Sequence, residues 1–300
     1  MYSAQRSESR KAALARACAT ATARELRSAV LPRYKMDPSG ELVPDVRAAA
    51  AITYDPETND VLWEEHSEDQ RSIASITKVM TATVFLEDNP DLTQPVTVVR
   101  SDVFHASTTR LRLNDQVTAD DLLHLLLIAS DNAAARALAR ISSVGAEGFI
   151  ERMNEKALEL GLTATRYADP SGLLSDNVSS AFDIARLIAY ASGDERISSI
   201  MRTPEYTVDA AKRKITFRST DYLLRRGDVD VRAGKTGFIS KSGYCFATLL
   251  HLPESGQNIA LVILGARSNA SRFIETQNLL NWLSSRAPAI FATRASATHQ

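Results

Sequence analysis

Runs of apolar residues bounded by turn residues mark strands near both ends of the chain's central part. Residues 48–54 and 61–63 are joined by a polar Asp-Pro-Glu-Thr-Asn-Asp segment, which predicts a β-hairpin. Further along, apolar runs at 231–238, 244–252 and 259–265 are separated by short turns. Because antiparallel strands can be joined by short turns, these three runs indicate a meander.

Between these strand regions, apolar residues recur three or four positions apart, which is the spacing of one helix face. This pattern predicts helices at 75–87, 122–128, 133–141, 145–162 and 180–192. A closing helix at 272–285 would cover one face of the sheet. We therefore predict an α+β fold in which a helical lobe is inserted into a sheet lobe.

Composition indicates a soluble globular protein and excludes several other classes. The 300 residues are 44% hydrophobic and 24% charged, with a formal net charge of −1. Such a balance gives no overall field to attract nucleic acid or an anionic membrane, and no apolar window is long enough for a transmembrane helix. The two cysteines, Cys18 and Cys245, are too few for a disulfide framework or a zinc site.

The amino-terminal segment differs from the rest of the chain. Residues 1–35 hold eight Lys/Arg and two Asp/Glu, a net +6, and the segment is rich in Ala and Arg. It lacks the continuous apolar stretch of a secretory signal peptide. We expect a frayed amphipathic helix or a mis-set start codon.

Three short motifs occur in a fixed order along the chain. Ser75-Ile-Thr-Lys78 begins a predicted helix, Ser130-Asp-Asn132 separates two helices, and Lys235-Thr-Gly237 lies in a predicted strand. Chance would produce about one Ser-x-x-Lys in this composition, but only about 0.06 copies of the second motif and about 0.02 of the third. Their joint occurrence is therefore informative.

A second Ser-Asp-Asn, at 175–177, competes with the first. It follows an Asp-Pro-Ser-Gly turn, whereas the copy at 130–132 interrupts two apolar helices and can point its side chains into a cleft. Clusters of Ser, Asp and Asn commonly serve turns and helix caps, so we assign the second copy to a loop.

Together the three motifs are the signature set of class A β-lactamases and penicillin-binding proteins. Over residues 46–285 the sequence resembles the low-molecular-mass penicillin-binding proteins, the serine D-alanyl-D-alanine carboxypeptidase/endopeptidase family. The resemblance extends over 71–82, 111–139, 169–183 and 234–245. It implies a β-lactamase/DD-peptidase-like fold, with a five-stranded antiparallel sheet flanked by helices and an inserted all-helical lobe.

The spacing of Ser75 and Lys78 puts a hydroxyl and an amine on one face of a helical turn. A serine hydroxyl needs a base to become a nucleophile, and Lys78 could serve if burial and a neighbouring cation, which we expect to be Lys235, lowered its pKa from about 10.4 toward 7. Ser75 would then attack the carbonyl of the penultimate D-Ala. Ser130 would pass a proton to the departing amine.

Other roles are implied by the resemblance. Asn132 would position the substrate amide and Lys78. The backbone N–H groups of Ser75 and Phe238 would hold the oxyanion. The substrate carboxylate would bind Lys235 and Thr236, and Gly237 would let an extended peptide lie along the strand. Asp131 is assigned to the turn itself.

The expected substrates are peptidoglycan stem peptides, and the expected covalent inhibitors are β-lactam antibiotics. Carboxypeptidase activity ranks first, although the chain ends soon after its closing helix, as in the shorter endopeptidase branch. A class A-like β-lactamase ranks lower, because no Glu lies between Glu159 and Glu195 to activate a deacylating water. A non-catalytic penicillin-binding scaffold is disfavoured by the intact motifs.

The remaining chemistry-bearing residues are given ordinary structural roles. His124 lies in an apolar helix without partners at catalytic spacing, and Cys245 lies in an apolar strand. The five histidines form no metal motif, and no Gly-rich phosphate loop is present, so we expect neither metal nor cofactor.

The resemblance also sets the expected domains and location. We expect an extension at 1–45, a catalytic domain at 46–287 with its helical lobe at roughly 80–210, and a tail at 288–300. The family acts outside the cytoplasmic membrane, so an extracytoplasmic location, in the periplasm or cell envelope, is expected despite the absence of a convincing signal peptide.

Overall fold

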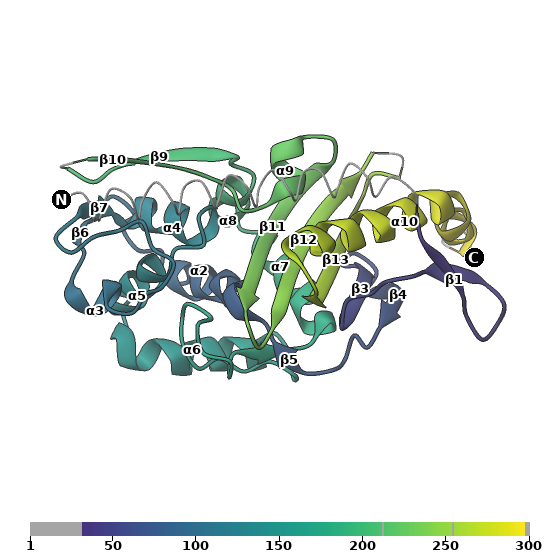
Figure 1. Ribbon diagram of the computed structural model, residues 1–300, viewed down its shortest axis with the longest axis horizontal. Coiled ribbons are helices and arrows are strands. Elements are labelled where there is room, and N and C mark those ends of the chain that lie inside the picture. The colour runs from purple at the N-terminus through teal and green to yellow at the C-terminus, as the bar shows by residue number, and fades with distance from the viewer. Residues whose placement is uncertain (1–31, 212, 254, 298–300) are drawn as a thin grey trace. The chain divides into compact units, whose positions relative to one another are not determined.

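The computed structural model describes residues 32–211, 213–253 and 255–297 (Figure 1). Two compact units account for their contacts: residues 48–266 form one, and the described parts of 1–47 and 267–300 belong to the other. Most of the predicted amino-terminal extension, including Cys18, lies outside the described residues.

The larger unit contains the predicted sheet. Its strands are β3 (Ala50–Asp55), β4 (Asp60–Glu65), β11 (Asp230–Ile239), β12 (Gly243–Leu252) and β13 (Gln257–Ala266). They run antiparallel in the order β11-β12-β13-β3-β4, which confirms both the hairpin and the meander. The two predicted pieces join where Val262 of β13 pairs with Ile52 of β3. β11 is left at an edge, where one side of its backbone faces away from the sheet.

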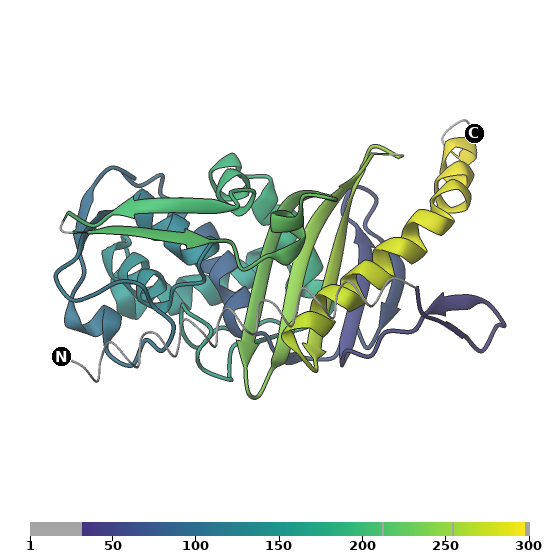
Figure 2. The same ribbon diagram turned by 45° about the horizontal axis from the view of Figure 1, so that its top comes forward.

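The predicted helices are confirmed. They are α2 (Lys78–Leu86), α4 (Ala119–Leu127), α5 (Asn132–Ile141), α6 (Gly145–Glu159) and α7 (Ala181–Ser192). α7 packs against β3, β12 and β13 through its buried apolar face, which includes Ile184 and Leu187. Figure 2 shows α2, α4, α5 and α6 gathered beside the β11 edge of the sheet.

The first of these helices begins differently from the prediction. Residues Ala74–Thr77 form a short 3₁₀ helix, η1, and the α-helix starts only at Lys78. The Thr77 hydroxyl donates a 2.8 Å hydrogen bond to the Ala74 carbonyl and helps to close this tighter turn.

The inserted lobe is not all helical, which corrects the prediction. Short antiparallel pairs join β5 (Arg71–Ser72) to β8 (Val178–Ser179), β6 (Pro95–Thr97) to β7 (Gln116–Thr118), and β9 (Glu205–Asp209) to β10 (Lys214–Arg218). In β9 and β10, polar and apolar residues alternate, which is a strand pattern that the sequence contains. The short helices α3 (Arg100–Val103), α8 (Glu195–Met201) and α9 (Tyr222–Arg226) complete the unit.

The smaller unit holds a hairpin and the closing helix. β1 (Tyr34–Met36) pairs with β2 (Leu42–Pro44), and α10 spans Asn269–Ala297. The predicted helix at 272–285 is confirmed, and α10 also includes residues 288–297, which the sequence assigned to a tail. Arg33 ties the two elements together, because its backbone N–H donates to Asn278 at 2.7 Å and its guanidinium pairs with Glu275 at 2.5 Å.

Candidate active site

Ser75 and Lys78 meet at the start of α2. The ammonium of Lys78 donates a 3.0 Å hydrogen bond to the Ser75 hydroxyl. Ser75 is half-buried and so remains open to solvent, whereas Lys78 is 0% exposed. The preceding residue, Ala74, has φ +47°, a left-handed conformation that is uncommon for a residue with a β-carbon and that clusters at functional sites.

Two further groups fix the Lys78 ammonium. It donates to the side-chain oxygen of Asn132 at 2.6 Å and to the backbone carbonyl of Ser171 at 2.5 Å. Asn132 in turn donates to the Ala106 carbonyl at 2.7 Å, so its amide orientation is set from both ends. The predicted contact between Asn132 and Lys78 is therefore present.

Burial lowers the pKa of Lys78 from its usual 10.5 to about 7, because the charged form loses its hydration. Asp131 and Asp169 oppose this change by favouring the ammonium, and Arg136 adds to it by repulsion. Arg136 is thus a cation that assists, and it was not identified from the sequence. At neutral pH a substantial fraction of Lys78 is an uncharged amine that can accept a proton.

The Ser130-Asp131-Asn132 turn connects α4 to α5. Asp131 is buried, and its carboxylate accepts from the N–H of Ala134, the N–H of Arg110 and the hydroxyl of Thr109. It therefore caps α5 and also anchors the loop before β7. The assignment of Asp131 to the turn is confirmed, and its additional anchoring of a distant loop could not be read from the motif.

β11 brings the third motif to the same place. Lys235 donates to the Ser130 hydroxyl at 2.8 Å and to the carbonyl of Thr236 at 2.9 Å, and Thr236 donates to Thr220 at 2.7 Å. Ser130 has φ +58°. The two serines, the two lysines and Asn132 therefore form one cluster built from η1, α2, the α4–α5 turn and the edge strand.

Gly237 has a structural role that the sequence analysis did not identify. A β-carbon at this position would lie 2.7 Å from the carbonyl oxygen of Ile73 and 3.2 Å from the backbone nitrogen of Ser75. Its missing side chain thus allows β11 to approach the turn that carries Ser75. The next residue, Phe238, is 48% exposed, and its ring stacks on Tyr244 at a centroid distance of 4.2 Å.

Several residues of the site were not identified from the sequence. Ser171 contributes only a backbone carbonyl, and Thr220 lies before a short helix in no recognisable motif. The Asp-Pro-Ser-Gly segment was identified as a turn and as part of the family resemblance, but not as part of the site. Its Gly172 has φ +78°, and a β-carbon there would lie 2.0 Å from the Ala74 carbonyl oxygen, so this loop presses on the Ser75 turn.

The second Ser-Asp-Asn lies in a loop, as predicted. Ser175 and Asp176 are exposed, and the buried Asn177 accepts from the N–H of Ala168 and donates to the carboxylate of Asp169. Asp169 also accepts from the backbone N–H groups of residues 171, 172 and 174. Its oxygens are thus engaged in holding the loop.

The residues set aside at the sequence level also have structural roles. The ring of His124 stacks on Tyr206 at 3.8 Å, with Nδ1 2.9 Å from the Asp120 carbonyl. Cys245 is buried in β12. Among the described residues, no group of three or more His, Cys, Asp or Glu side chains could hold a metal ion. Within the same residues, no helix is long and apolar enough to cross a membrane.

Comparison with known proteins identifies the family. The D-alanyl-D-alanine endopeptidase of Haemophilus influenzae is 34% identical over 235 residues, which are 78% of this chain and 80% of that protein. The D-alanyl-D-alanine carboxypeptidase DacC of Escherichia coli is 31% identical over 80% of this chain and 62% of its own length. The cefotaxime-bound structure of penicillin-binding protein D2 from Listeria monocytogenes superimposes with a TM-score of 0.72, at 26% identity over 80% of this chain and 98% of that chain.

The likeness to the solved structure confirms the predicted α+β, DD-peptidase-like fold. The sequence profile of the D-alanyl-D-alanine carboxypeptidase family, Peptidase_S11, matches residues 37–268 and so includes all three motifs. This chain belongs to the Peptidase_S11 family of D-alanyl-D-alanine carboxypeptidases.

Proposed function

We propose that this protein is a serine D-alanyl-D-alanine peptidase that acts on peptidoglycan stem peptides through an acyl-enzyme on Ser75. The observation that carries this proposal is the 3.0 Å contact between the half-buried Ser75 hydroxyl and the fully buried Lys78 amine. A nucleophile within hydrogen-bond reach of a base, which is itself oriented by a third group, is the arrangement that covalent catalysis requires. Asn132 is that third group.

In the proposed acylation, the Ser75 oxygen forms a bond to the carbonyl carbon of the penultimate D-Ala, and its proton moves to the neutral amine of Lys78. The tetrahedral intermediate then breaks its C–N bond. Ser130 gives its hydroxyl proton to the leaving amine and is reprotonated from the Lys78 side. The 2.8 Å bond from Lys235 to the Ser130 hydroxyl stabilises the serine while it lacks its proton.

Binding groups surround this centre. We assign the oxyanion to the backbone N–H groups of Ser75 and Phe238, and the terminal carboxylate of the substrate to Lys235 and Thr236. The close approach of β11 to the Ser75 turn, which Gly237 permits, supports the oxyanion assignment because it brings the two backbone segments together. Each such donor contributes roughly 3–4 kcal/mol to transition-state stabilisation.

We further propose that β-lactams acylate Ser75 and leave slowly. Rapid hydrolysis requires a second base to activate water, but the carboxylates of Asp131 and Asp169 are engaged by backbone and side-chain donors. The similarity to a penicillin-binding protein solved with cefotaxime bound supports β-lactam binding at this site. Rapid nitrocefin turnover would instead favour a β-lactamase.

The test of the nucleophile uses a fluorescent penicillin and two alanine variants. Ser75→Ala should abolish covalent labelling because it removes the attacking oxygen. Ser175→Ala is the matched control, since Ser175 belongs to the exposed second Ser-Asp-Asn and should leave labelling unchanged. Labelling that persists in Ser75→Ala would refute the assignment.

The bond cleaved is a separate question. The family and our sequence prediction indicate a carboxypeptidase, which removes the terminal D-Ala. An endopeptidase, which opens D-Ala cross-links, is the second candidate because three relatives that are 31–34% identical to this chain are named D-alanyl-D-alanine endopeptidases. Mass analysis of digested muropeptides separates them: a carboxypeptidase shortens pentapeptide monomers by one D-Ala, and an endopeptidase converts dimers to monomers.

Peptidoglycan lies outside the cytoplasmic membrane, so we propose that the protein acts there, in the periplasm or cell envelope. Cell fractionation followed by penicillin labelling of each fraction tests this location. We also propose residues 46–287 as the catalytic domain and 1–45 as a separate extension. Limited proteolysis that leaves a labelled fragment of these bounds would support that division.

A further inference from the structure

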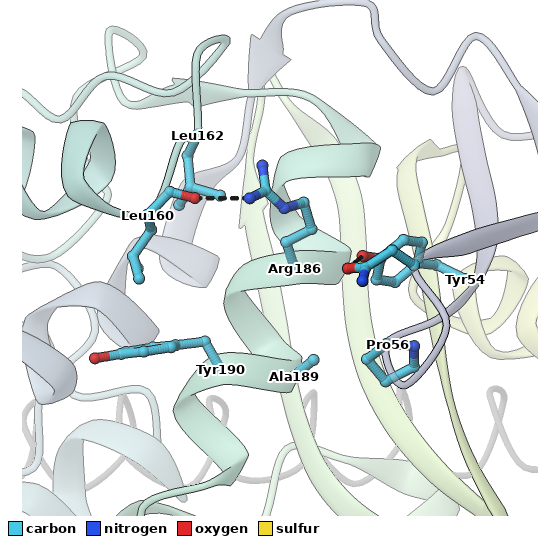
Figure 3. A pocket seen from close by; sticks show the side chains of 8 residues that line it. Tyr54, Pro56, Leu160, Leu162, Arg186, Ala189 and Tyr190 are labelled. Atoms are coloured by element: carbon cyan, nitrogen blue, oxygen red, sulfur yellow. Dashed lines mark hydrogen bonds between the residues drawn. The ribbon is translucent and has the colours of Figure 1, made fainter.

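Two open cavities lie next to each other on the larger unit, away from Ser75. One, of about 300 Å³, lies over the exposed face of α7, where Arg186, Ala189 and Tyr190 are spaced three and four residues apart (Figure 3). The other, of about 980 Å³, reaches the C-terminal end of α2 at Leu86. Tyr190 lines both cavities and is 50% exposed. We name the pair the Tyr190 groove.

The groove carries many charges but no net charge. Four carboxylates and three cations line the larger cavity, and Arg186 in the smaller one makes the cations four as well. These charges are largely paired within the groove: Lys156 lies 2.5 Å from Glu87, and Arg196 lies 2.6 Å from Asp194. A groove of this kind offers no field to select an ion. It presents hydrogen-bonding groups whose positions are already fixed.

The smaller cavity combines apolar walls with a few oriented donors. The guanidinium of Arg186 donates to the carbonyls of Leu160 and Gly161 at 2.9 and 2.8 Å, which holds it rigid with further N–H groups to offer. Asn59 accepts from the Tyr54 hydroxyl at 2.7 Å. Figure 3 shows the Arg186 side chain extending from α7 toward Leu160, with the Tyr190 and Tyr54 side chains on opposite sides of that helix.

An exposed aromatic ring among fixed donors and acceptors, without net charge, suits a neutral carbohydrate. The C–H face of a pyranose is apolar and packs on an aromatic ring, and its hydroxyl and acetamido groups exchange hydrogen bonds with polar side chains. The groove's extension on both sides of Tyr190 favours a chain of sugars over a single one. The Lys156 ammonium, which lines the larger cavity, lies over the Tyr190 ring at 6.0 Å from its centre.

We propose that the Tyr190 groove binds the glycan strands of peptidoglycan, with Tyr190 as the stacking platform. This inference rests on the proposed function, because it assigns a second binding site for the same polymer. Leu86 and Lys78 are at opposite ends of α2, about 12 Å apart at 1.5 Å per residue. A strand held in the groove would therefore tether the enzyme to the polymer and raise the effective concentration of nearby stem peptides at Ser75.

The binding test uses chitotetraose, a neutral β-1,4-linked chain of four N-acetylglucosamines, titrated calorimetrically into the full chain. We expect binding by the wild type, a loss of about tenfold in Tyr190→Ala, and a change of less than about twofold in Tyr190→Phe, which keeps the ring. Leu158→Ala is the matched control: Leu158 is 73% exposed on α6 but lines neither cavity. Unfolding temperatures confirm that each variant is folded.

The functional test compares two substrates. Hydrolysis of a soluble D-Ala-D-Ala peptide should be equal in the wild type and Tyr190→Ala, whereas release of product from insoluble peptidoglycan should fall several-fold in Tyr190→Ala. Absence of chitotetraose binding, equal binding by Tyr190→Ala, or tighter binding of poly-L-glutamate would overturn the proposal. If the wild type fails on the soluble peptide, the proposed function fails instead, and chitotetraose binding still decides the groove.

Discussion

The pH dependence of acylation tests the central chemical feature of the site. Burial brings the pKa of Lys78 down from 10.5 to about 7, and the neutral amine is the form that can take the Ser75 proton. The experiment varies the pH between about 5.5 and 9 and measures the rate of acylation by a penicillin under pseudo-first-order conditions. The rate should follow the neutral fraction of Lys78.

The expected size of the rate change follows from the pKa of Lys78. With a pKa of about 7, the neutral fraction is about 9% at pH 6 and about 91% at pH 8, so the rate should rise about tenfold and then level off. A lysine with an ordinary pKa would be less than about 1% neutral at pH 8. A rate that keeps rising tenfold per pH unit through pH 9 would therefore refute the buried-base mechanism.

The lowered pKa of Lys78 also makes the free energy of unfolding depend on pH. The folded state holds Lys78 with a pKa of about 7, whereas an unfolded lysine keeps a value near 10.5. Between these values the unfolded chain binds more protons, so Lys78 makes the free energy of unfolding rise with pH across that window. The full change in the free energy of unfolding is roughly 5 kcal/mol, at about 1.4 kcal/mol per pKa unit. Below pH 7 this whole amount destabilises the fold. Urea unfolding of Lys78→Met should show a flatter slope from about pH 7.5 to 9.5 than the wild type, and equal slopes would contradict the shift.

Three substitutions test the structure around Ser75. Gly172→Ala should destabilise the fold by roughly 2–4 kcal/mol, because the residue has φ +78° and the new β-carbon would lie 2.0 Å from a backbone oxygen. Thermal melts measure this loss of stability. Gly227→Ala is the control, because Gly227 also has a positive φ, +74°, but has open space around it and so reports backbone strain alone. Gly237→Ala should push β11 away from the turn and lower the acylation rate at least about tenfold, measured by penicillin labelling, and an unchanged rate would show that the close approach is dispensable. Asp131→Asn should cost roughly 2–3 kcal/mol in urea unfolding, because an amide cannot accept from the Arg110 and Ala134 N–H groups and the Thr109 hydroxyl together.

The sequence predicted the fold wherever a pattern was long and regular. The continuous apolar runs at 244–252 and 259–265 became the central strands β12 and β13, because strands buried on both faces show no alternation. The hairpin β9–β10 was overlooked although its residues alternate, since the helices around it led to the expectation of an all-helical lobe. Local sequence patterns therefore predicted most elements correctly. Where elements were short, as in β9 and β10, the prediction followed the helical pattern of the neighbouring segments and was wrong.

Within the site, the motifs predicted which side chains would meet but not what holds them. Ser75 and Lys78 are adjacent by helical spacing alone, so their contact could be expected from the sequence. The Ser171 carbonyl, in contrast, accepts from Lys78 although the two residues are 93 positions apart in the sequence. Because it is a backbone group, any residue at position 171 could supply it. The contribution of Arg136 to the lowered pKa of Lys78 could not be predicted either, because charge effects depend on distances that a sequence does not contain.

The two glycines beside Ser75 explain how an unfavourable backbone conformation persists there. Gly172, from the loop after α6, approaches the Ala74 carbonyl from one segment, and Gly237 of β11 approaches the Ile73 carbonyl from another. Ala74 lies between these contacts with φ +47°, a conformation that costs of order 1–3 kcal/mol and persists only where surrounding structure determines it. Both glycines also lie close to the Ser75 backbone nitrogen, at 2.9 and 3.2 Å from their would-be β-carbons. The strain at Ala74 is therefore the local cost of holding the Ser75 turn between these two segments, and residues remote in sequence supply the packing that offsets it.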